Sequence, residues 1–470
     1  MPKIIDDTRT LRIEKIVQGG MGLAKDDGKT FFIYGALPDE RIVARIYTKR
    51  KGVYFGETID IIEPSPIRIE PKCEHFGKCG GCTFQHIPYE KQLEFKRAIV
   101  DETLHRIGKF DNIEIEDIVP SPMQWGYRNK MEFAFGKNND GVFVGLHRRG
   151  RFDQLLPVAK DCLLISDEMR NVVISIEEMA RSEIPYDPKS GTGYLRFLTI
   201  RKSFAMNKLL VGITITRNIE PETFKFWFEE LDRQFPELIA GGFITINLAG
   251  SSSCGEIIPL FGENEFIEKI GEKKFSVSAD SFFQTNPLGA EKLYSVVKNF
   301  AEPRGDEKLW DLYCGTGTIG IYLRDSVASV LGIESNEKSI DDARKNAELN
   351  EMELETKRNE IVLPSDGKVH FISGDVKKIL WEFQQRNFEP PDIITIDPPR
   401  AGLSKKVVAR IAHFAPKRIV YVSCNPVTLA RDGALFGENG FKLVRVRPVD
   451  MFPQTYHIES VALFEKYRPT

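Results

Sequence analysis

The segment Asp311-Leu312-Tyr313-Cys314-Gly315-Thr316-Gly317-Thr318-Ile319-Gly320 decides the fold of this 470-residue chain. It ends an apolar strand candidate, residues 306–312, and its three glycines fit the pattern G-x-G-x-x-G. Glycines at this spacing form a tight turn between a strand and a helix, and they let the backbone come close to a ligand. The segment therefore predicts the first strand, loop and helix of an α/β domain that binds a cofactor at the strand end.

Further apolar strand candidates follow this loop and are separated by helical stretches. They cover residues 329–333, 369–372, 392–396 and 418–422. Strands that alternate with helices predict a parallel sheet with helices on both faces. We therefore expect residues 266–470 to form one α/β domain.

The glycine loop alone fits dinucleotide dehydrogenases as well as enzymes that use S-adenosylmethionine. Asp311 favours the second class, because its carboxylate suits the charged amino-acid end of S-adenosylmethionine and would repel a pyrophosphate. Glu334, at the end of the next strand, is placed to accept hydrogen bonds from ribose hydroxyls. Asp375, which follows the third strand, is a candidate for the adenine side.

Cys424 lies in Ser423-Cys424-Asn425-Pro426, directly after a strand candidate. Asn is a favoured N-cap and Pro a favoured first helical residue, so the thiol should lie between a strand end and a helix N-terminus. Helix N-terminal amides stabilise a thiolate, which is the nucleophilic form of cysteine. A buried cysteine that acts as a small apolar residue is the alternative, and the residues around Cys424 argue against it.

Two carboxylates are expected at the same edge of the sheet. Asp397 follows the strand before Cys424, and Glu459 precedes the terminal strand, residues 460–464. Pyrimidine C5 is a poor nucleophile, but thiolate addition at C6 gives an adduct that takes a methyl group at C5, after which a base removes the C5 proton. Cys424 and Glu459 fit these two steps, and the target base must leave its stack to reach them.

These motifs resemble the RNA uracil-C5-methyltransferases, which modify 23S rRNA and the T-loop of tRNA, and the resemblance covers nearly the whole chain. The matching stretches are Phe282-Phe283-Gln284-Thr285-Asn286-Pro287, the glycine loop, Asp397-Pro398-Pro399-Arg400-Ala401-Gly402-Leu403, Ser423-Cys424-Asn425-Pro426 and the segment ending in Glu459. The resemblance implies that Cys424 is the nucleophile and Glu459 the proton-abstracting base. It also implies a set of cofactor or uracil contacts, namely Gln284, Tyr313, Glu334 and Asp397.

Four cysteines form a candidate metal site. Cys73, Cys79 and Cys82 lie close together in the sequence, and Cys162 is the obvious fourth ligand. The odd, modest total of seven cysteines argues against a disulfide framework. Four thiolates can hold zinc or an iron–sulfur cluster, and their spacing does not decide between the two. The resemblance implies a [4Fe-4S] cluster, for which we expect a structural or RNA-positioning role because methyl transfer moves no net electrons.

The remaining cysteines and two histidines near the cysteine motif are expected to have other roles. We expect Cys254 and Cys314 to be packing residues. His75 and His86 are expected to be histidines with satisfied hydrogen bonds rather than metal ligands.

The N-terminal part of the chain indicates two further domains. Residues 1–62 alternate short β-like runs with turns, which predicts a small β-barrel, and the resemblance implies that it is an RNA-binding TRAM domain. Residues 63–265 are assigned to a central α+β domain that carries the metal cluster. Within it we expect a helix over residues 89–107 that packs on the catalytic domain, and one helix near residues 221–235.

Charge and hydropathy narrow the setting of the protein. The net charge is −3, but basic residues gather in residues 41–51 and 147–151, where they either steer phosphates or form ordinary solvated turns. No run of 18 apolar residues and no secretory signal pattern are present. We therefore expect a cytoplasmic monomer without membrane contact.

The sequence favours an RNA m5U methyltransferase, with 23S rRNA preferred to tRNA as the substrate. A dehydrogenase would give no role to Cys424 or Glu459, and a non-catalytic iron–sulfur RNA-binding protein would leave both unexplained. Cytosine-C5 methylation is the nearest enzymatic rival. In the sequence pattern of the RNA enzymes that methylate cytosine C5, a second cysteine lies in the Asp-Pro-Pro region. This chain has Arg400 at that place.

Overall fold

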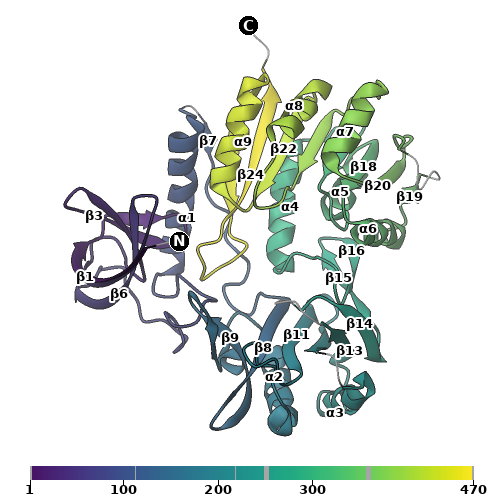
Figure 1. Cartoon of the computed structure of the whole chain (residues 1–470). Helices are drawn as coiled ribbons and strands as arrows, with labels where there is room; N and C mark the ends of the chain where they lie inside the picture. Colours follow the sequence, from purple (N-terminus) through teal and green to yellow (C-terminus); the bar gives the residue numbers. More distant parts are fainter. Residues whose placement is uncertain (1–2, 112, 217–218, 248–252, 356–360, 468–470) are drawn as a thin grey trace.

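The computed structural model describes residues 3–111, 113–216, 219–247, 253–355 and 361–467. Three large sheets follow one another along the chain, and Figure 1 shows the N-terminal sheet in purple, the central sheet in blue to teal and the C-terminal sheet in green to yellow. Within the described residues, no helix combines the length and the apolar character needed to cross a lipid bilayer.

The N-terminal sheet has six strands in the order β1-β5-β6-β4-β3-β2, and it lies where the sequence predicts a small β-barrel. Its strands are β1 (Lys3–Arg12), β2 (Lys15–Val17), β3 (Met21–Asp26), β4 (Lys29–Tyr34), β5 (Arg41–Arg50) and β6 (Val53–Glu63). A separate core that includes Phe31 and Ile33 fills it. One of the β-like runs of the sequence, residues 11–17, is divided between β1 and β2, and the N–H groups of Ile13 and Glu14 between them donate to the main-chain oxygens of Glu40 and Leu23.

The central sheet has seven strands in the order β10-β9-β8-β11-β12-β13-β14. They are β8 (Lys130–Asn138), β9 (Gly141–Arg148), β10 (Arg151–Leu156), β11 (Leu195–Ser203), β12 (Lys208–Ile215), β13 (Ile239–Ile246) and β14 (Glu256–Gly262). Helices α2 (Asp167–Met179) and α3 (Lys225–Gln234) share one apolar core with it. A two-stranded hairpin, β15 (Glu265–Ile270) and β16 (Lys273–Ser278), leads to the C-terminal sheet.

The C-terminal sheet has nine strands in the order β19-β20-β18-β17-β21-β22-β24-β23-β7. Its strands are β17 (Lys308–Leu312), β18 (Ser329–Glu334), β19 (Glu353–Leu354), β20 (Lys368–Ser373), β21 (Ile393–Ile396), β22 (Arg418–Ser423), β23 (Phe441–Val449) and β24 (Glu459–Lys466), together with β7 (Glu114–Ile115). The five strands expected from the sequence are β17, β18, β20, β21 and β22, and they pair in parallel.

Helices from both sides cover this sheet, and two apolar clusters fill the spaces between them. The helices are α4 (Pro287–Ala301), α5 (Thr318–Leu323), α6 (Glu337–Leu349), α7 (Val376–Gln385), α8 (Lys405–Phe414) and α9 (Pro426–Glu438). The alternation of strands and helices, with the sheet between helical layers, is the α/β arrangement that the sequence predicts.

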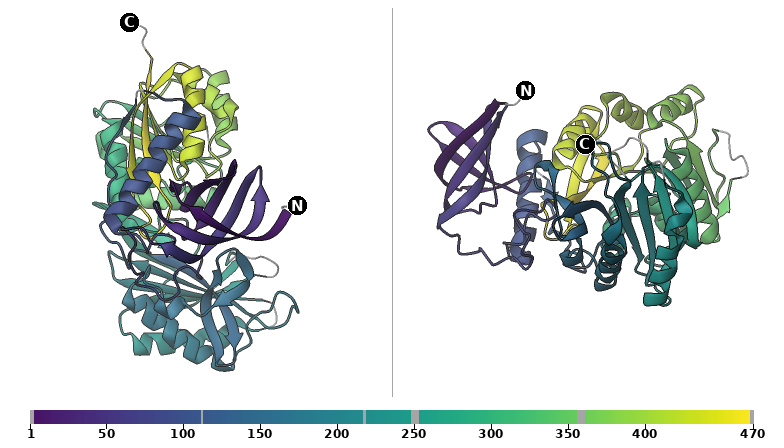
Figure 2. Two further views of the ribbon diagram at one scale, coloured as in Figure 1. Left: turned by 90° about the vertical axis from the view of Figure 1, so that its left-hand side faces the viewer. Right: turned by 60° about the horizontal axis from the view of Figure 1, so that its bottom comes forward.

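Helix α1 (Tyr89–Thr103) comes before the central sheet in the chain but packs on the C-terminal one. It continues into a π-helical turn (Leu104–Gly108), and the short strand β7 then pairs with β23. Figures 1 and 2 show α1 between the N-terminal sheet and the strands and helix at the C-terminus. Lys15 joins the N-terminal sheet to this helix through an ion pair with Glu102 (2.7 Å).

Candidate active site and cysteine cluster

Cys424 lies in the turn between β22 and α9, as its sequence context predicts. Asn425 is the N-cap of α9, and its Oδ1 accepts a hydrogen bond from the Val427 N–H (3.1 Å), while Pro426 is the first helical residue. The thiol is partly buried. The local signals of the sequence are therefore sufficient to place this residue.

Glu459 and Asp397 reach the same edge of the sheet from the strands on either side of β22. Strand β24 runs antiparallel to β22 and pairs Ser460 with Ser423, so Glu459 lies beside the end of β22. On the other side, β21 pairs in parallel with β22 and ends at Ile396, directly before Asp397. A thiol and two carboxyl groups thus converge from three neighbouring strands.

This convergence changes the acidity of the thiol in a direction that the sequence did not predict. Burial, followed by the charges of Glu459 and Asp397, raises the pKa of Cys424 to about 11, and the nearby Arg400 offsets only part of this effect. The expectation that the helix N-terminus is enough to ionise the thiol is therefore wrong. The physical reason is that desolvation and two like charges outweigh the N-terminal amides of α9.

The carboxyl groups are also shifted toward their neutral forms. Burial, and next the charge of Asp311, raises the pKa of Asp397 to about 7. Burial and the charge of Asp397 raise the pKa of Glu459 well above its usual value. Because a carboxylate of raised pKa is the stronger base once ionised, Glu459 suits proton abstraction.

The glycine loop between β17 and α5 combines a strained backbone with an open side. Tyr313 has a positive φ of 62°, a region that side chains other than Gly rarely adopt. Gly317 has a φ of 77°, and a Cβ there would lie 2.9 Å from the Phe371 ring. Gly315 also has a positive φ, of 53°, but a Cβ there would meet no atom within 4 Å, so this part of the loop leaves room for a ligand.

Asp311 has a role other than the expected ligand contact. It is fully buried, and its Oδ2 accepts from the Gly320 N–H (2.9 Å) while its Oδ1 accepts from the Thr395 hydroxyl (2.8 Å). Both carboxylate oxygens therefore hold the glycine loop to α5 and to β21. The sequence alone does not show that the carboxylate turns inward.

The other predicted cofactor contacts lie at strand ends around this loop. Chain order reverses between β17 and β21, and ligands of open α/β sheets bind at such a reversal. Glu334 ends β18 and uses one oxygen, Oε1, to accept from Ser335 and Asn336. Asp375 is the N-cap of α7, where its Oδ1 accepts from the Lys378 N–H (2.9 Å), so this carboxylate already has a structural partner.

Gln284 lies in the segment that leads from the β15–β16 hairpin into α4. Its main-chain oxygen accepts from the Asn129 side chain (3.1 Å), and its own side chain reaches Tyr294. The Tyr294 hydroxyl in turn meets the Thr318 hydroxyl (2.8 Å) in the first turn of α5. This chain of contacts brings Gln284 close to the glycine loop, although the two are about thirty positions apart in the sequence.

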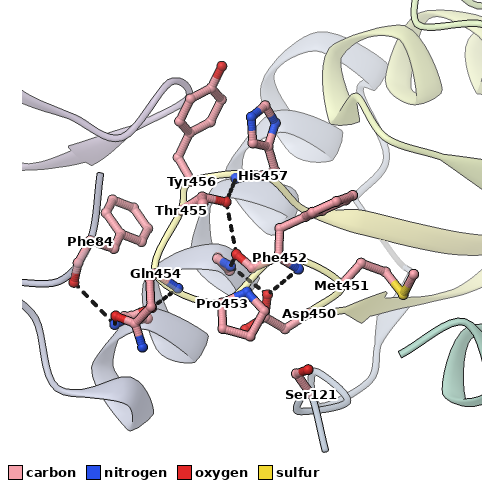
Figure 3. Close-up of polar contacts among 12 residues, drawn as sticks. Phe84, Ser121, Asp450, Met451, Phe452, Pro453, Gln454, Thr455, Tyr456 and His457 are labelled. Carbon is pink, nitrogen blue, oxygen red and sulfur yellow. Dashed lines mark hydrogen bonds and ion pairs between the residues drawn. The ribbon is translucent and has the colours of Figure 1, made fainter. Parts of the chain in front are cut away.

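The loop before Glu459 is anchored by residues that the sequence analysis did not single out. Lys96 of α1 is fully buried, and its Nζ donates to Asp450 Oδ1 (2.6 Å) and to the Phe452 carbonyl (3.1 Å). Figure 3 shows this loop from Asp450 to His457, with Phe84 and Ser121 beside it. The sequence contains a signal for the role of Lys96, because this lysine lies on the same helix face as the buried residues Gln92, Ile99, Val100 and Thr103. A charged residue on a buried face needs a partner, which here is Asp450.

The four predicted metal ligands line one cavity of about 450 Å³. His75 Nε2 lies 3.2 Å from Asp161 Oδ2 and so joins the segment that carries Cys73 to the one that carries Cys162. Among the described residues, no three of the four sulfur atoms lie within 4.8 Å of one another. A single zinc ion with Zn–S bonds of about 2.3 Å needs sulfur atoms closer together than this.

The remaining residues with a predicted packing or histidine role differ in burial and in hydrogen bonding. Cys314 is buried in an apolar cluster, as expected. Cys254 is exposed, so the expectation that it is a packing residue is wrong. His86 is buried against Phe76, but neither ring nitrogen has a hydrogen-bond partner within the described part of the chain, and burial lowers its pKa to about 3. The expectation of a satisfied histidine is therefore wrong too.

Some of the basic residues that are expected to steer phosphates make contacts with other residues of this protein. Arg149 donates to the main-chain oxygen of Cys82 (2.8 Å), and its guanidinium lies over the Tyr34 ring of the N-terminal sheet. In β5, Arg41 and Arg45 form ion pairs with Glu63 and Glu57 of β6. These residues therefore tie structural elements together.

Comparisons with known proteins agree with this site. Residues 88–467 match the family model described as tRNA (uracil-5-)-methyltransferase. A protein of Caldanaerobacter subterraneus subsp. tengcongensis, named as an uncharacterized RNA methyltransferase, is 38% identical over 466 residues, which is 97% of this chain and 98% of the relative. A Clostridium tetani protein of the same description is 36% identical, with 96% of each chain covered.

A solved structure is similar over the whole length. The crystal structure of Pyrococcus abyssi tRNA (uracil-54, C5)-methyltransferase in complex with S-adenosyl-L-homocysteine superposes with a TM-score of 0.74 and 26% sequence identity. The match covers 99% of this chain and 100% of that one. The arrangement of the three sheets is therefore shared with an experimentally determined methyltransferase.

Proposed function

Because this chain belongs to the tRNA (uracil-5-)-methyltransferase family and is an RNA methyltransferase that uses S-adenosylmethionine, we propose that it methylates C5 of a uridine in 23S rRNA. The observation that carries the proposed chemistry is the convergence of Cys424, Asp397 and Glu459 from three neighbouring strands. A nucleophile and a base at one sheet edge are what C5 methylation of a pyrimidine requires.

The first half of the reaction is assigned to Cys424. Its sulfur, in the thiolate form, makes a bond to C6 of the uracil, and the electron pair of the C5=C6 double bond moves to C5. S-adenosylmethionine supplies the electrophilic methyl group when bound. The C5–methyl bond then forms as the bond between the methyl carbon and the sulfonium sulfur breaks, which leaves S-adenosylhomocysteine, and Cys424 remains bonded to C6 of the methylated ring.

The second half is assigned to Glu459. Its carboxylate takes the proton from C5, the C5=C6 double bond forms again, and the bond between C6 and the Cys424 sulfur breaks. Burial keeps water away from this proton transfer. The product is 5-methyluridine with the enzyme thiolate restored.

Cofactor and uracil contacts are proposed for the strand-end residues around the glycine loop. Glu334 would accept hydrogen bonds from the ribose hydroxyls, and Tyr313 and Gln284 would contact cofactor or uracil. Asp397 would contact either of them from the end of β21. Asp375 would serve the adenine side, although its role as N-cap of α7 leaves it fewer acceptor sites.

We also propose that the four cysteines, Cys73, Cys79, Cys82 and Cys162, hold a [4Fe-4S] cluster. Their shared cavity and the spread of their sulfur atoms support this proposal over a single zinc ion. Such a cluster would bind the loop around Cys79 to the turn around Cys162. A cluster with four thiolate ligands would have this bridging function without electron transfer.

The RNA substrate has a second candidate. The cysteine set favours 23S rRNA through the family resemblance, whereas the similar Pyrococcus abyssi structure is that of a tRNA (uracil-54, C5)-methyltransferase. We propose the T-loop of tRNA as the alternative target. The N-terminal sheet is proposed to bind RNA in either case.

One experiment tests the chemistry and the substrate together. Methyl transfer from labelled S-adenosylmethionine would be measured on total RNA from a strain that lacks this gene, with 23S rRNA and tRNA separated before nucleoside mass spectrometry. The proposal expects 5-methyluridine in 23S rRNA, and the same nucleoside in tRNA alone would move the target. Cys424→Ala is the control, because it should abolish turnover while cofactor binding remains.

A further inference from the structure

The loop Asp450–His457 between β23 and β24 is held from outside its own sheet. Gln454 has a positive φ of 66°, which disfavours its conformation unless neighbours fix it. Its N–H donates to Gln92 Oε1 (3.0 Å), and its Oε1 accepts from Gln92 Nε2 (3.0 Å), so the two side chains and one peptide form a closed pair of hydrogen bonds. Both residues are buried, and this contact therefore replaces water at the loop.

The residues next to Cys82 hold the same loop from a second direction. The N–H groups of Thr83 and Phe84 both donate to the Gln454 carbonyl, at 2.9 and 3.0 Å. The Thr83 hydroxyl accepts from the Tyr456 N–H (2.8 Å). Thr83 directly follows Cys82. The segment that ends the cysteine motif therefore contacts the loop Asp450–His457 through its main chain and through the Thr83 side chain.

Two links complete the connection between cysteine motif, α1 and loop. Gln92 Nε2 also donates to the Phe84 carbonyl (3.1 Å), so α1 and the segment after Cys82 support each other. Lys96 fixes the start of the loop through its buried ion pair with Asp450. Two neighbouring segments, Thr83–Phe84 and α1, thus define the path of the loop that enters β24 at Glu459, and Gln92 and Gln454 are 362 positions apart in the sequence.

We propose that Thr83 and Gln92 are positioning residues that set where Glu459 stands relative to Cys424. This inference rests on the proposed function, in which Glu459 removes the C5 proton. Cys424 lies between β22 and α9, whereas Glu459 follows the loop after one residue, Ile458. A loosened loop should therefore slow the release of the adduct far more than its formation.

The cysteine motif acquires a function through this arrangement. A group that ties Cys82 to the other cysteines restrains Thr83 and Phe84, and these two residues restrain Gln454 and Tyr456. The same contacts would be weakened if Cys82 were free to move. The cysteine site thus supports proton abstraction mechanically, through hydrogen bonds of this chain.

Thr83→Val is the sharpest test, because it keeps the β-branched shape and removes the hydroxyl that accepts from Tyr456. Single-turnover reactions would follow the covalent protein–RNA adduct and the methylated product separately. We expect adduct formation within about twofold of the unaltered protein and adduct resolution slowed by about 10- to 100-fold, the range for a slightly misplaced catalytic group. Thr83→Ser, which restores the acceptor, should resolve the adduct at nearly the original rate.

Hydrogen exchange supplies a readout apart from activity. The Tyr456 amide should exchange faster in Thr83→Val than in Thr83→Ser, while amides of β17 stay equally protected and the metal content of both variants is unchanged. Equal slowing of adduct formation and resolution, or a Thr83→Val protein that resolves the adduct normally, would overturn the positioning role. Absence of any adduct or 5-methyluridine with the unaltered protein would instead reject the proposed function itself.

Discussion

At the scale of single residues, the electrostatics of the candidate site is set by neighbours in space. The sequence predicts the position of Cys424, because Asn425 and Pro426 signal a helix start within three residues. It does not predict the raised pKa, because Glu459 comes from a strand 35 positions later and reaches Cys424 only through the antiparallel pairing of β24. The ligand-free site therefore holds a neutral thiol near neutral pH.

The first prediction concerns the pH dependence of this thiol. A pKa of about 11 instead of the ordinary 9 leaves about 100-fold less thiolate at pH 8, since each pKa unit is a factor of ten. Alkylation of Cys424 by iodoacetamide should therefore be slow at pH 8 and keep rising up to pH 10. Mass spectrometry of the modified peptide measures the rate, and a plateau below pH 8 would contradict the raised pKa.

Cofactor charge provides a matched control for the same measurement. The sulfonium of S-adenosylmethionine is a cation, whereas S-adenosylhomocysteine has a neutral sulfur and nearly the same shape. If the two carboxyl groups suppress ionisation, a nearby cation should favour the thiolate. Alkylation at pH 8 should then be faster with S-adenosylmethionine than with S-adenosylhomocysteine.

The second prediction concerns Glu459. Glu459→Gln keeps the size of the side chain but removes its basicity, so Cys424 should still form the adduct and the C5 proton should stay in place. A protein–RNA species that survives denaturing gel electrophoresis should accumulate, with turnover reduced by about 10²- to 10⁴-fold, the usual contribution of a general base. The Cys424→Ala protein should form no such species, and unimpaired turnover by Glu459→Gln would remove this residue from the proposed mechanism.

At the scale of secondary structure, the sequence predicts the apolar strands of the C-terminal sheet correctly but does not predict every helix. The five parallel strands of the C-terminal sheet are mostly apolar, and the sequence predicts them within about two residues at each end. Helix α2 was missed, although Ser166 precedes it and Met169, Val172, Val173 and Ile176 form its buried face. The apolar residues of α2 recur with the helical spacing of three to four residues, but the surrounding region alternates as strands do. The sequence of this region therefore indicates strands and turns where the structure has a helix.

The third prediction tests how α1 is fixed to the sheet. Lys96→Met removes the cation of a fully buried ion pair and leaves Asp450 uncompensated, so it should lower the free energy of unfolding by about 3–5 kcal/mol. Lys91→Met is the control on the same helix, because the ion pair of Lys91 with Glu94 is exposed and should contribute about 0–1 kcal/mol. Denaturant unfolding of the C-terminal sheet gives the free energy of unfolding of both variants. Equal values would show that Lys96 does not stabilise the buried carboxylate of Asp450.

The fourth prediction concerns removal of the proposed metal cluster from the cysteines. Stripping this proposed cluster with an oxidant and a chelator should free Cys82 and weaken the hydrogen bonds that Thr83 and Phe84 donate to Gln454. Amide exchange at Thr83 and Tyr456 should then accelerate by about tenfold, as expected for a loss of about 1.4 kcal/mol of local stability. Amides of β18 serve as the internal control, and unchanged exchange at Tyr456 would mean that the cysteines do not restrain the loop.

At the scale of the whole molecule, the N-terminal sheet is docked on the rest of the protein. Gly20, in the turn between β2 and β3, packs against Tyr456 and Phe84 so closely that an added Cβ would lie 2.9 Å from the Tyr456 Cβ. Glu40, fully buried, binds Arg68 in the segment that leaves this sheet. The sequence predicts a boundary near residue 62, and β6 ends at Glu63, but nothing in the sequence indicates that the first unit contacts the loop before Glu459.

The fifth prediction compares two glycines with nearly the same backbone conformation. Gly20 and Gly28 have φ values of 71° and 69°, but a Cβ at Gly28 would meet nothing within 4 Å. Gly20→Ala should therefore cost about 1–3 kcal/mol more than Gly28→Ala through overpacking, and it should reduce methylation of RNA the more strongly. Thermal unfolding and methyl transfer by the two variants measure the difference, and matching behaviour would show that docking at Gly20 is unimportant.

The contact between α1 and the last loop also sets when the protein can fold during its synthesis. Gln92 and Gln454 are 362 positions apart, so the ribosome releases α1 long before its partner strands exist. Until α9, β23 and β24 emerge, the part of this helix that packs on them remains in water and is open to chaperones and proteases. A message that stops shortly before Glu459 would therefore yield an unstable chain that the cell removes, with no partly active enzyme left behind.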